Sequence, residues 1–267
     1  MKLLWSKSVP VEDPWEPALA GVFCRLEEKV HFLYMDGGNM AVLTEDSDRA
    51  ARYETGEKAL PLPNRWILCQ NKILLSEELL FDISRGTFTD LSGTLRASEY
   101  SSLRKPEKYY VEATFAHNGY EISHKGNFGY QCTKSGRKIW EFRGQGYLYT
   151  DICFWKNRVF FGTAGQGGYF YVLDLQTGEV LRKIKTGGTA SFAAEDHCCY
   201  VLTNENNAKL LCVDLTDGSI RDELALPGST SVYSRLYLNA GKLHAVTFSN
   251  GRKQLQGAFW NCAEIGF

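Results

Sequence analysis

The sequence lacks an excess of charge of either sign, since 30 Lys and Arg residues against 31 Asp and Glu residues leave a net charge of −1 at pH 7. Such a balance gives no overall field that would attract nucleic acid or an anionic membrane. Long apolar runs are also missing, which excludes a membrane-spanning helix of about 18 or more apolar residues. The first residues, MKLLWSK, lack the apolar core of a signal peptide because Lys7 interrupts them. We therefore expect a cytoplasmic protein without nucleic-acid or membrane partners.

Common catalytic and metal-binding motifs are absent as well. The sequence contains no GxSxG motif, no phosphate-binding loop and no paired zinc ligands, and its five histidines are scattered along the chain. The eight cysteines form no CxxC motif, and most of them lie in apolar runs, as is typical of reduced, buried cysteines. We expect no catalytic residue, no bound metal and no cofactor.

The stretch from residue 147 to residue 188 shows what the sequence does contain. Three short runs rich in aromatic and β-branched residues precede a charged run, and turn residues separate them. The run at 159–161 and the run YFYVL at 169–173 are too short and too rich in such residues for helices. Asn157 and the segment 174–178 mark chain reversals. One such unit cannot bury its own faces, so we expect it to recur.

Two markers recur along the chain with nearly the same period. The first is an Asp-x-x-x-Gly turn, or a variant of it, near residues 44–48, 82–86, 133–136, 174–178 and 214–218. The second is a polar turn between two apolar runs, at residues 27–28, 70–71, 117–118, 156–157, 195–196 and 240–241. These six turns are spaced by about 40 to 47 residues, and the agreement of two markers indicates a repeat protein.

A period of about 40 residues with four strands per unit is typical of a β-propeller. We therefore predict an all-β fold and a single domain over residues 1–267, namely a six-bladed β-propeller of four-stranded antiparallel blades. The predicted blades cover residues 20–54, 65–97, 108–143, 148–186, 190–226 and 231–262.

The two ends of the chain predict how this ring would close. The last unit supplies only three apolar runs, and the chain begins with an unassigned run at residues 2–9, in which Trp5 matches Trp140 of the third unit. We predict that residues 2–9 complete the last blade as its outer strand, which would close the ring and cover a sheet edge. Deleting residues 1–9 should then cost several kcal/mol or abolish folding.

The strand order of a four-stranded meander also places the loops. The longer connections, such as 94–107 and 143–147, all fall at one end of the sheets, which we call the long-loop face. Rigid scaffolds present functional residues on loops, and aromatic and arginine side chains dominate interface energies. The predicted binding residues on this face are Trp15, Tyr100, Arg104, Tyr147, Gln166, Asn204 and Asn206.

The segment 168–181, GYFYVLDLQTGEVL, resembles the repeat of the PQQ-like (quinoprotein-alcohol-dehydrogenase-like) β-propellers, and residues 135–140 and 211–220 resemble it too. The Asp and Gly of this repeat are expected to build a turn, because the turn needs a side-chain acceptor and a positive φ. The family includes quinoprotein dehydrogenases with a vicinal disulfide, to which Cys198-Cys199 is similar. Those enzymes have larger eight-bladed rings, however, and residues 197–202 fit a plain strand. We expect no redox role for the pair.

Taken together, these features favour a non-enzymatic scaffold that binds a protein or peptide through the long-loop face. The alternative is a small-molecule or sugar-processing hydrolase or lactonase with its site at the channel mouth, where innermost strands can bring together residues such as Glu112 and Asp151. Three or more His, Asp, Glu or Asn side chains around one point would favour the enzyme. An exposed apolar patch on the long-loop face would favour the scaffold, with a small-molecule ligand as a further possibility.

Overall fold

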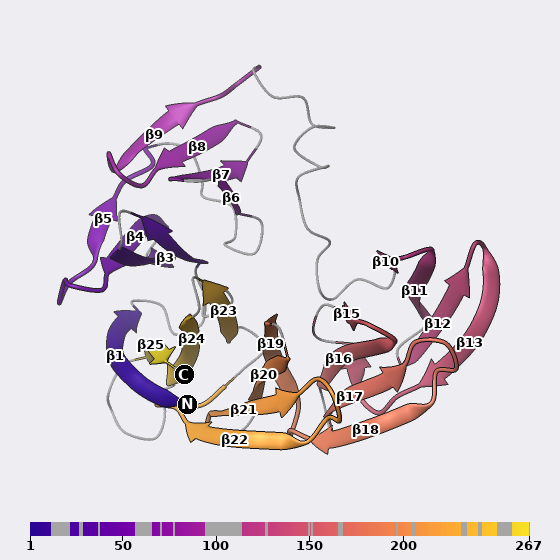
Figure 1. Ribbon diagram of the computed structural model, residues 1–267. Coiled ribbons are helices and arrows are strands. Elements are labelled where there is room, and N and C mark those ends of the chain that lie inside the picture. The colour runs from indigo at the N-terminus through magenta and orange to yellow at the C-terminus, as the bar shows by residue number, and fades with distance from the viewer. Residues whose placement is uncertain are drawn as a thin grey trace. The chain divides into compact units, whose positions relative to one another are not determined.

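A computed structural model gives the structure of the protein (Figure 1). It describes residues 1–11, 22–26, 29–36, 38–56, 66–69, 71–76, 78–93, 114–125, 128–148, 150, 152–164, 168–195, 197–203, 207–230, 234–239, 242–249 and 258–266.

The described residues form six antiparallel sheets, and most strands pair with the next strand in the sequence. The first two sheets contain β2 (Val22–Leu26), β3 (Lys29–Asp36), β4 (Asn39–Thr44) and β5 (Ala51–Tyr53), and then β6 (Ile67–Cys69), β7 (Lys72–Ser76), β8 (Leu79–Asp82) and β9 (Thr87–Asp90). The third contains β10 (Thr114–His117), β11 (Tyr120–Lys125), β12 (Gly129–Lys134) and β13 (Arg137–Arg143).

The fourth sheet contains β14 (Tyr147–Leu148), β15 (Cys153–Trp155), β16 (Arg158–Ala164), β17 (Tyr169–Asp174) and β18 (Val180–Lys185). Both β14 and β15 pair with β16, so the expected innermost strand of this unit is split in two. The fifth sheet contains β19 (Thr189–Glu195), β20 (Cys198–Thr203), β21 (Lys209–Asp214) and β22 (Ile220–Ala225). The sixth contains β23 (Arg235–Asn239), β24 (Lys242–Ser249), β25 (Ala258–Gly266) and β1 (Lys2–Val11).

The prediction of a closed six-bladed propeller is wrong. The sheets are six separate ladders and none of them is closed on itself. The chain divides into two compact units, unit 1 (1–6, 106–248 and 263–267) and unit 2 (7–105 and 249–262). The repeat pattern failed as a guide to closure because a period specifies each sheet and its nearest neighbour, but not how many neighbours join into a ring. The single-domain prediction stays a prediction.

The N-terminal strand lies where the sequence placed it within its own sheet. Strand β1 is the edge strand beside β25, in the order β1-β25-β24-β23. Met1 and Leu3 pack against the apolar cluster that includes Leu243 and Ile265.

The Asp and Gly residues of the repeat have the predicted structural role. The Oδ1 atom of Asp174 accepts hydrogen bonds at 2.8 Å from the backbone N–H groups of Gln176 and Thr177, and Gly178 has a φ of 73°. The carboxylates of Asp82 and Asp214 accept hydrogen bonds from backbone N–H groups in the same way. The turn between the third and fourth strands is therefore fixed by chemistry that the sequence encodes locally.

Neighbouring sheets of unit 1 bury apolar residues against each other. The sheets β10–β13 and β14–β18 share a core that includes Ile122, Trp140, Phe161 and Leu173. The sheets β14–β18 and β19–β22 share another, with Phe170 and Val201 among its members. In unit 2, Leu33, Ile73 and Phe81 form the core between sheets β2–β5 and β6–β9.

One position on the outer strands contacts the following sheet in each repeat of unit 1. Trp140 lies opposite Cys132, Arg182 opposite Val172, and Asp222 opposite Cys212. The indole N–H of Trp140 donates to the carbonyl of Leu175 at 2.8 Å, and the side chain of Arg182 contacts Gly218. Asp222 pairs with the N-terminal ammonium of Met1. Three different side chains at equivalent positions of the outer strands thus each contact the sheet that follows.

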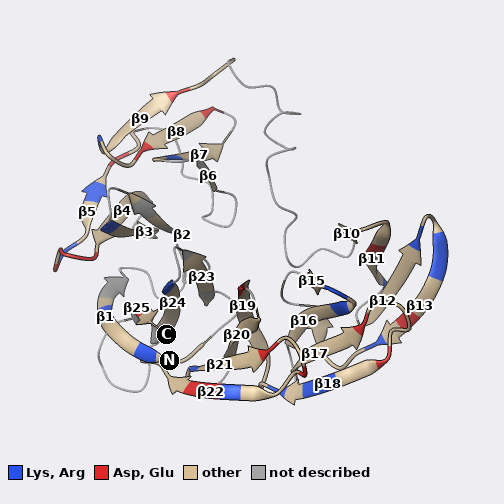
Figure 2. Ribbon diagram, in the orientation of Figure 1, with Lys and Arg blue, Asp and Glu red and all other residues tan. Residues whose placement is uncertain are grey.

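The outer strands β13, β18 and β22 carry many charged residues, as Figure 2 shows. Each also contains a register shift opposite the preceding strand. Charge and bulges on an edge strand oppose pairing with other chains.

Six cysteines have side chains that the structure describes, and all six, including Cys198 and Cys199, carry free thiols. Burial raises the pKa of the Cys24 thiol to about 12 and that of the Cys132 thiol to about 11. These thiols therefore behave as small apolar core residues, as predicted. In the described part of the chain, no helix is long and apolar enough to cross a membrane.

Candidate functional site

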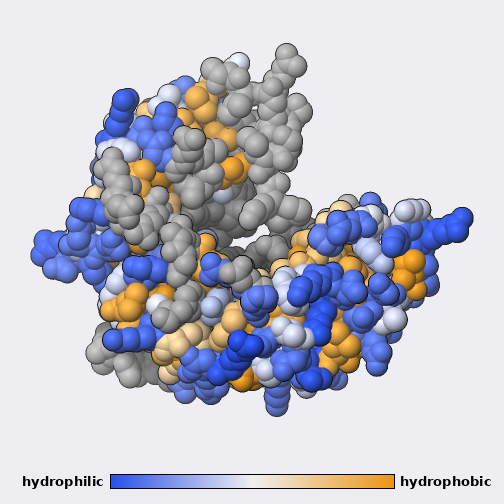
Figure 3. All heavy atoms as spheres, in the orientation of Figure 1, coloured by the Kyte–Doolittle hydropathy of each residue, from blue (hydrophilic) through white to orange (hydrophobic). Residues whose placement is uncertain are grey.

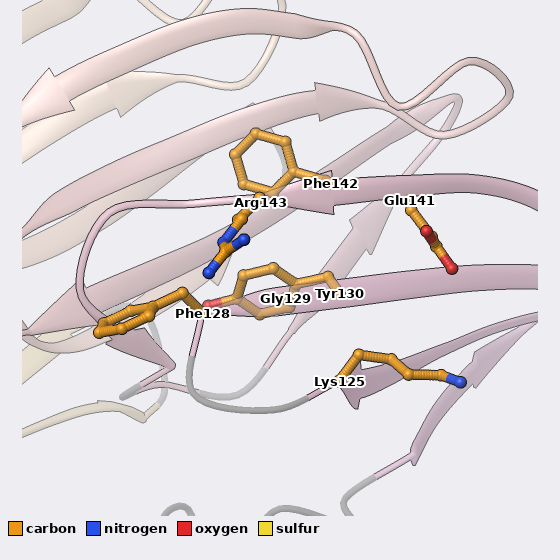
Figure 4. Close-up of a pocket in the computed structure, with 7 residues that line it drawn as sticks. All are labelled: Lys125, Phe128, Gly129, Tyr130, Glu141, Phe142 and Arg143. Atoms are coloured by element: carbon orange, nitrogen blue, oxygen red, sulfur yellow. The ribbon is translucent and has the colours of Figure 1, made fainter.

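A pocket of about 660 Å³ lies in unit 1, beside the turn that joins β11 to β12. This turn and the connection after β13 belong to the long-loop face. The pocket is lined by Lys125, Phe128, Gly129, Tyr130, Glu141, Phe142 and Arg143 (Figure 4).

The register of β12 and β13 places these side chains. Gly129 lies opposite Arg143, and Tyr130 lies opposite Phe142. Because side chains alternate across a strand, Tyr130 and Phe142 share one face of the sheet, and Arg143 belongs to the other. Gly129 is required here, since a Cβ atom would lie 2.4 Å from the carbonyl oxygen of Lys125.

The inner side of the pocket is a group of packed aromatic rings. The ring of Tyr130 is 4.6 Å from that of Phe161 between centroids, and the ring of Phe142 is 5.2 Å from that of Tyr171. Phe161 and Tyr171 stack on each other at 5.4 Å. Such a group holds the pocket wall in one arrangement, because each ring is fixed by its neighbours on the adjacent sheet.

Two buried polar atoms beside the pocket have no hydrogen-bond partner among the described residues. They are the hydroxyl of Tyr130, a residue with 1% of its surface exposed, and Nε2 of His124. The two residues are a cross-strand pair, with ring centroids 5.6 Å apart. Burial raises the pKa of Tyr130 and lowers that of His124, so both side chains are neutral near pH 7. Leaving a buried polar group unpaired costs about 1 to 3 kcal/mol.

The charged groups at the pocket are predominantly positive. In the part of the chain that the structure describes, the side chains of Lys125 and Arg143 form no ion pair and no hydrogen bond, and both are exposed. The carboxylate of Glu141 is 3.0 Å from the ammonium of Lys138, so the pocket lining carries two positive side chains against one negative side chain that already has a cation beside it.

An aromatic rim continues from the pocket onto the neighbouring sheet. Tyr147, with 51% of its surface exposed, packs on Phe128 with ring centroids 4.8 Å apart. Next to it, the ammonium of Lys183 donates to the side-chain oxygen of Gln145 at 2.9 Å and lies 4.0 Å from the ring centroid of Tyr169. The visible face in Figure 3 likewise shows small groups of hydrophobic residues between hydrophilic ones.

Unit 2 contains a second pocket, of about 550 Å³. It is lined by Lys7, Ser8, Tyr34, Asp36, Leu43, Asp48, Arg49, Ala50 and Arg52. Asp36 is 4% exposed, and one of its oxygens lies 2.7 Å from the guanidinium of Arg52. Its other oxygen has no hydrogen-bond partner within the described ranges. Oppositely charged groups are mixed in this pocket, so it selects for no single charge.

Of the predicted binding residues, only Tyr147 lies among the described residues. Trp15, Tyr100, Arg104, Gln166, Asn204 and Asn206 lie outside them, as do Glu112 and Asp151. The remaining predicted site therefore stays a prediction. Sequence reasoning missed Phe128, Tyr130 and Arg143, because two of them lie within or at the end of strands. The loop 143–147 was the one signal that could have directed attention to them.

The described residues include no group of three or more His, Cys, Asp or Glu side chains placed to hold a metal ion. One acidic group among them, Glu264, is 3% exposed and has two side-chain partners. One of its oxygens accepts from Lys242 at 2.7 Å and the other lies 3.0 Å from Nε2 of His244. Burial raises the pKa of Glu264, but the hydrogen bonds from Lys242 and His244 lower it by more, so the pKa lies below its ordinary value.

No family model matches the chain, and no curated protein matches it in sequence. Among solved structures it is similar to BamB from Moraxella catarrhalis, with 12% identity, a TM-score of 0.48, and coverage of 93% of this chain and 83% of that chain. It is also similar to the computationally designed protein Ika4, with 12% identity, a TM-score of 0.42, and coverage of 54% of this chain and 88% of that chain. For the designed protein Ika8 the identity is 13%, the TM-score 0.33, and the coverage 92% and 83%. At these identities and scores the similarities assign no family, and membership of the PQQ-like family stays a prediction.

Proposed function

We propose that this protein is a scaffold that binds a protein or peptide partner through the pocket beside β11–β13 and the adjoining aromatic rim. The observation that carries the proposal is the exposed ring of Tyr147 packed on Phe128 at the edge of a rigid, aromatic-walled pocket. Exposed aromatic side chains supply large contact areas at low entropic cost and are enriched at the energetic centres of interfaces. The wall is held by two packed sheets, so binding need not order it first.

A peptide library displayed on phage and selected against the full chain tests this proposal. We expect enriched peptides that bind the purified protein in solution by isothermal titration calorimetry. Substituting Tyr147→Ala or Phe128→Ala should weaken these peptides by about tenfold or more, since truncating an aromatic anchor commonly costs at least 1 to 2 kcal/mol of binding energy.

Ile139→Ala is the matched control, because Ile139 is also apolar and 43% exposed but is not among the residues that line the pocket. It should leave peptide binding unchanged. An absence of enriched peptides, or equal weakening by Ile139→Ala and Tyr147→Ala, would overturn the proposal.

A further inference from the structure

The pocket beside β11–β13 combines a positive charge with a hydrogen-bond donor that has no acceptor. The guanidinium of Arg143 and the ammonium of Lys125 have no partner in the described part of the chain, and Glu141 is held by Lys138. The hydroxyl of Tyr130, which follows Gly129 in β12, is buried and has no partner in the same described part. Each of these three groups can donate a hydrogen bond, and together they lack an acceptor.

We propose that this pocket binds an acidic segment of a partner, in which a side-chain carboxylate of Asp or Glu stands next to an aromatic or large aliphatic residue. This inference rests on the proposed function and names the chemistry of its ligand. The carboxylate would accept from Arg143, and the ammonium of Lys125 on the same pocket would add to the attraction for an acidic segment. The apolar neighbour would pack on Phe128 and Tyr147, whose rings already touch.

Charge complementarity decides between an acidic ligand and other occupants. A basic segment would meet two unpaired cations, and like charges brought together at an interface cost several kcal/mol. A wholly apolar segment would cover Arg143 and Lys125 without giving them an acceptor, and burying an unpaired charge is unfavourable. An acidic segment removes both costs, because hydrogen bonds between ionised groups are about twice as strong as neutral ones.

Tyr130 gives the proposal a second, independent observation. Its hydroxyl has no hydrogen-bond partner among the residues that the structure describes, so the fold gains no bond from it there. A ligand oxygen that reaches this hydroxyl from the pocket would supply the missing acceptor. A purely structural role for Tyr130 requires only its ring, which packs against Phe161 and Phe142.

The test uses the full chain and the probe acetyl-Gly-Ser-Asp-Phe-Asp-Leu-Ser-Gly-amide, with binding measured by isothermal titration calorimetry at low salt. We expect the probe to bind, its Asn-Phe-Asn analogue to bind at least tenfold more weakly, and affinity for the acidic probe to fall as NaCl is added. Arg143→Gln should weaken the acidic probe about tenfold and the Asn analogue much less. Arg137→Gln, at the other end of β13, is the matched control and should change neither.

Tyr130→Phe separates binding from structure. It should weaken the acidic probe about threefold or more, while the protein unfolds at the same or a higher denaturant concentration. The inference would be overturned if the acidic probe and its Asn analogue bound equally, or if neither Arg143→Gln nor Tyr130→Phe changed binding of the acidic probe. The proposed function would remain intact in that case, provided that library peptides still bind at Tyr147. If the Asn analogue bound as well as the acidic probe once its C-terminal amide was replaced by a free carboxylate, the side-chain carboxylate would not be required, and the inference would also be overturned. If no library peptide bound, both proposals would be overturned.

Discussion

Replacing Gly178 by alanine should destabilise the contact between sheets β10–β13 and β14–β18 far more than replacing the equivalent Gly136. Both glycines have a positive φ, 73° and 76°, which an alanine adopts at a cost of about 1 to 2 kcal/mol. The two sites differ in their surroundings. A Cβ atom at Gly178 would lie 2.6 Å from the Trp140 ring, whereas one at Gly136 would meet no atom within 4 Å.

The magnitude follows from what Trp140 must give up. The ring is 6% exposed, and its N–H donates to the carbonyl of Leu175, so it cannot move aside without losing this bond and its packing. A lost hydrogen bond that leaves a buried partner costs about 1 to 3 kcal/mol. We therefore expect a loss of about 3 to 4 kcal/mol for Gly178→Ala and of about 1 to 2 kcal/mol for Gly136→Ala.

Hydrogen exchange is the suitable assay, because it reports local opening even if the two compact units unfold separately. Amides of β13 and β17 should lose protection in Gly178→Ala and keep most of it in Gly136→Ala. In a Trp140→Leu background the extra cost of Gly178→Ala should largely vanish, because the contact that causes it is gone. Equal losses of protection for the two glycine variants would refute the reasoning.

Three further predictions follow from buried groups and from the first strand. Glu264 has a lowered pKa in the folded protein, so its contribution to stability is present above its unfolded pKa and is lost as the pH falls through the folded pKa. In Glu264→Gln the free energy of unfolding, measured by urea titrations below about pH 5, should therefore depend less on pH. Burial raises the pKa of Cys199 well above its usual range, so this thiol should react slowly with iodoacetamide. Site-resolved mass spectrometry should find Cys199 unlabelled at pH 8 in the native protein and labelled in urea. Fast labelling of the native protein would contradict its burial. Deleting residues 1–6 removes part of β1 and the contacts of Met1 and Leu3, so it should expose the edge of β25 and lower the midpoint temperature of unfolding. An unchanged melting curve would contradict this prediction.

The sequence was sufficient for features that depend on residues close together in the chain. The repeat of turn and apolar run predicted antiparallel sheets one after another, and the Asp174–Gly178 segment predicted its own turn, because the side-chain acceptor and the residue with positive φ lie within five positions. The unassigned run at 2–9 was correctly matched to the last sheet, because that sheet had one strand too few.

Only the tertiary structure decided how these sheets are grouped and where a pocket forms. The prediction of a closed propeller was wrong, since nothing in one repeat specifies the number of its neighbours, and the chain divides into six separate sheets and two compact units. Tyr130 looked like an ordinary inward-facing strand residue, and its unpaired hydroxyl depends on which side chains of β13 and of the adjacent sheet surround it. Arg143 looked like one charge among many, and its position beside Phe128 results from the register of β12 with β13. Hydrogen-bond satisfaction and charge pairing are properties of three-dimensional neighbours, so the sequence pattern could not give them.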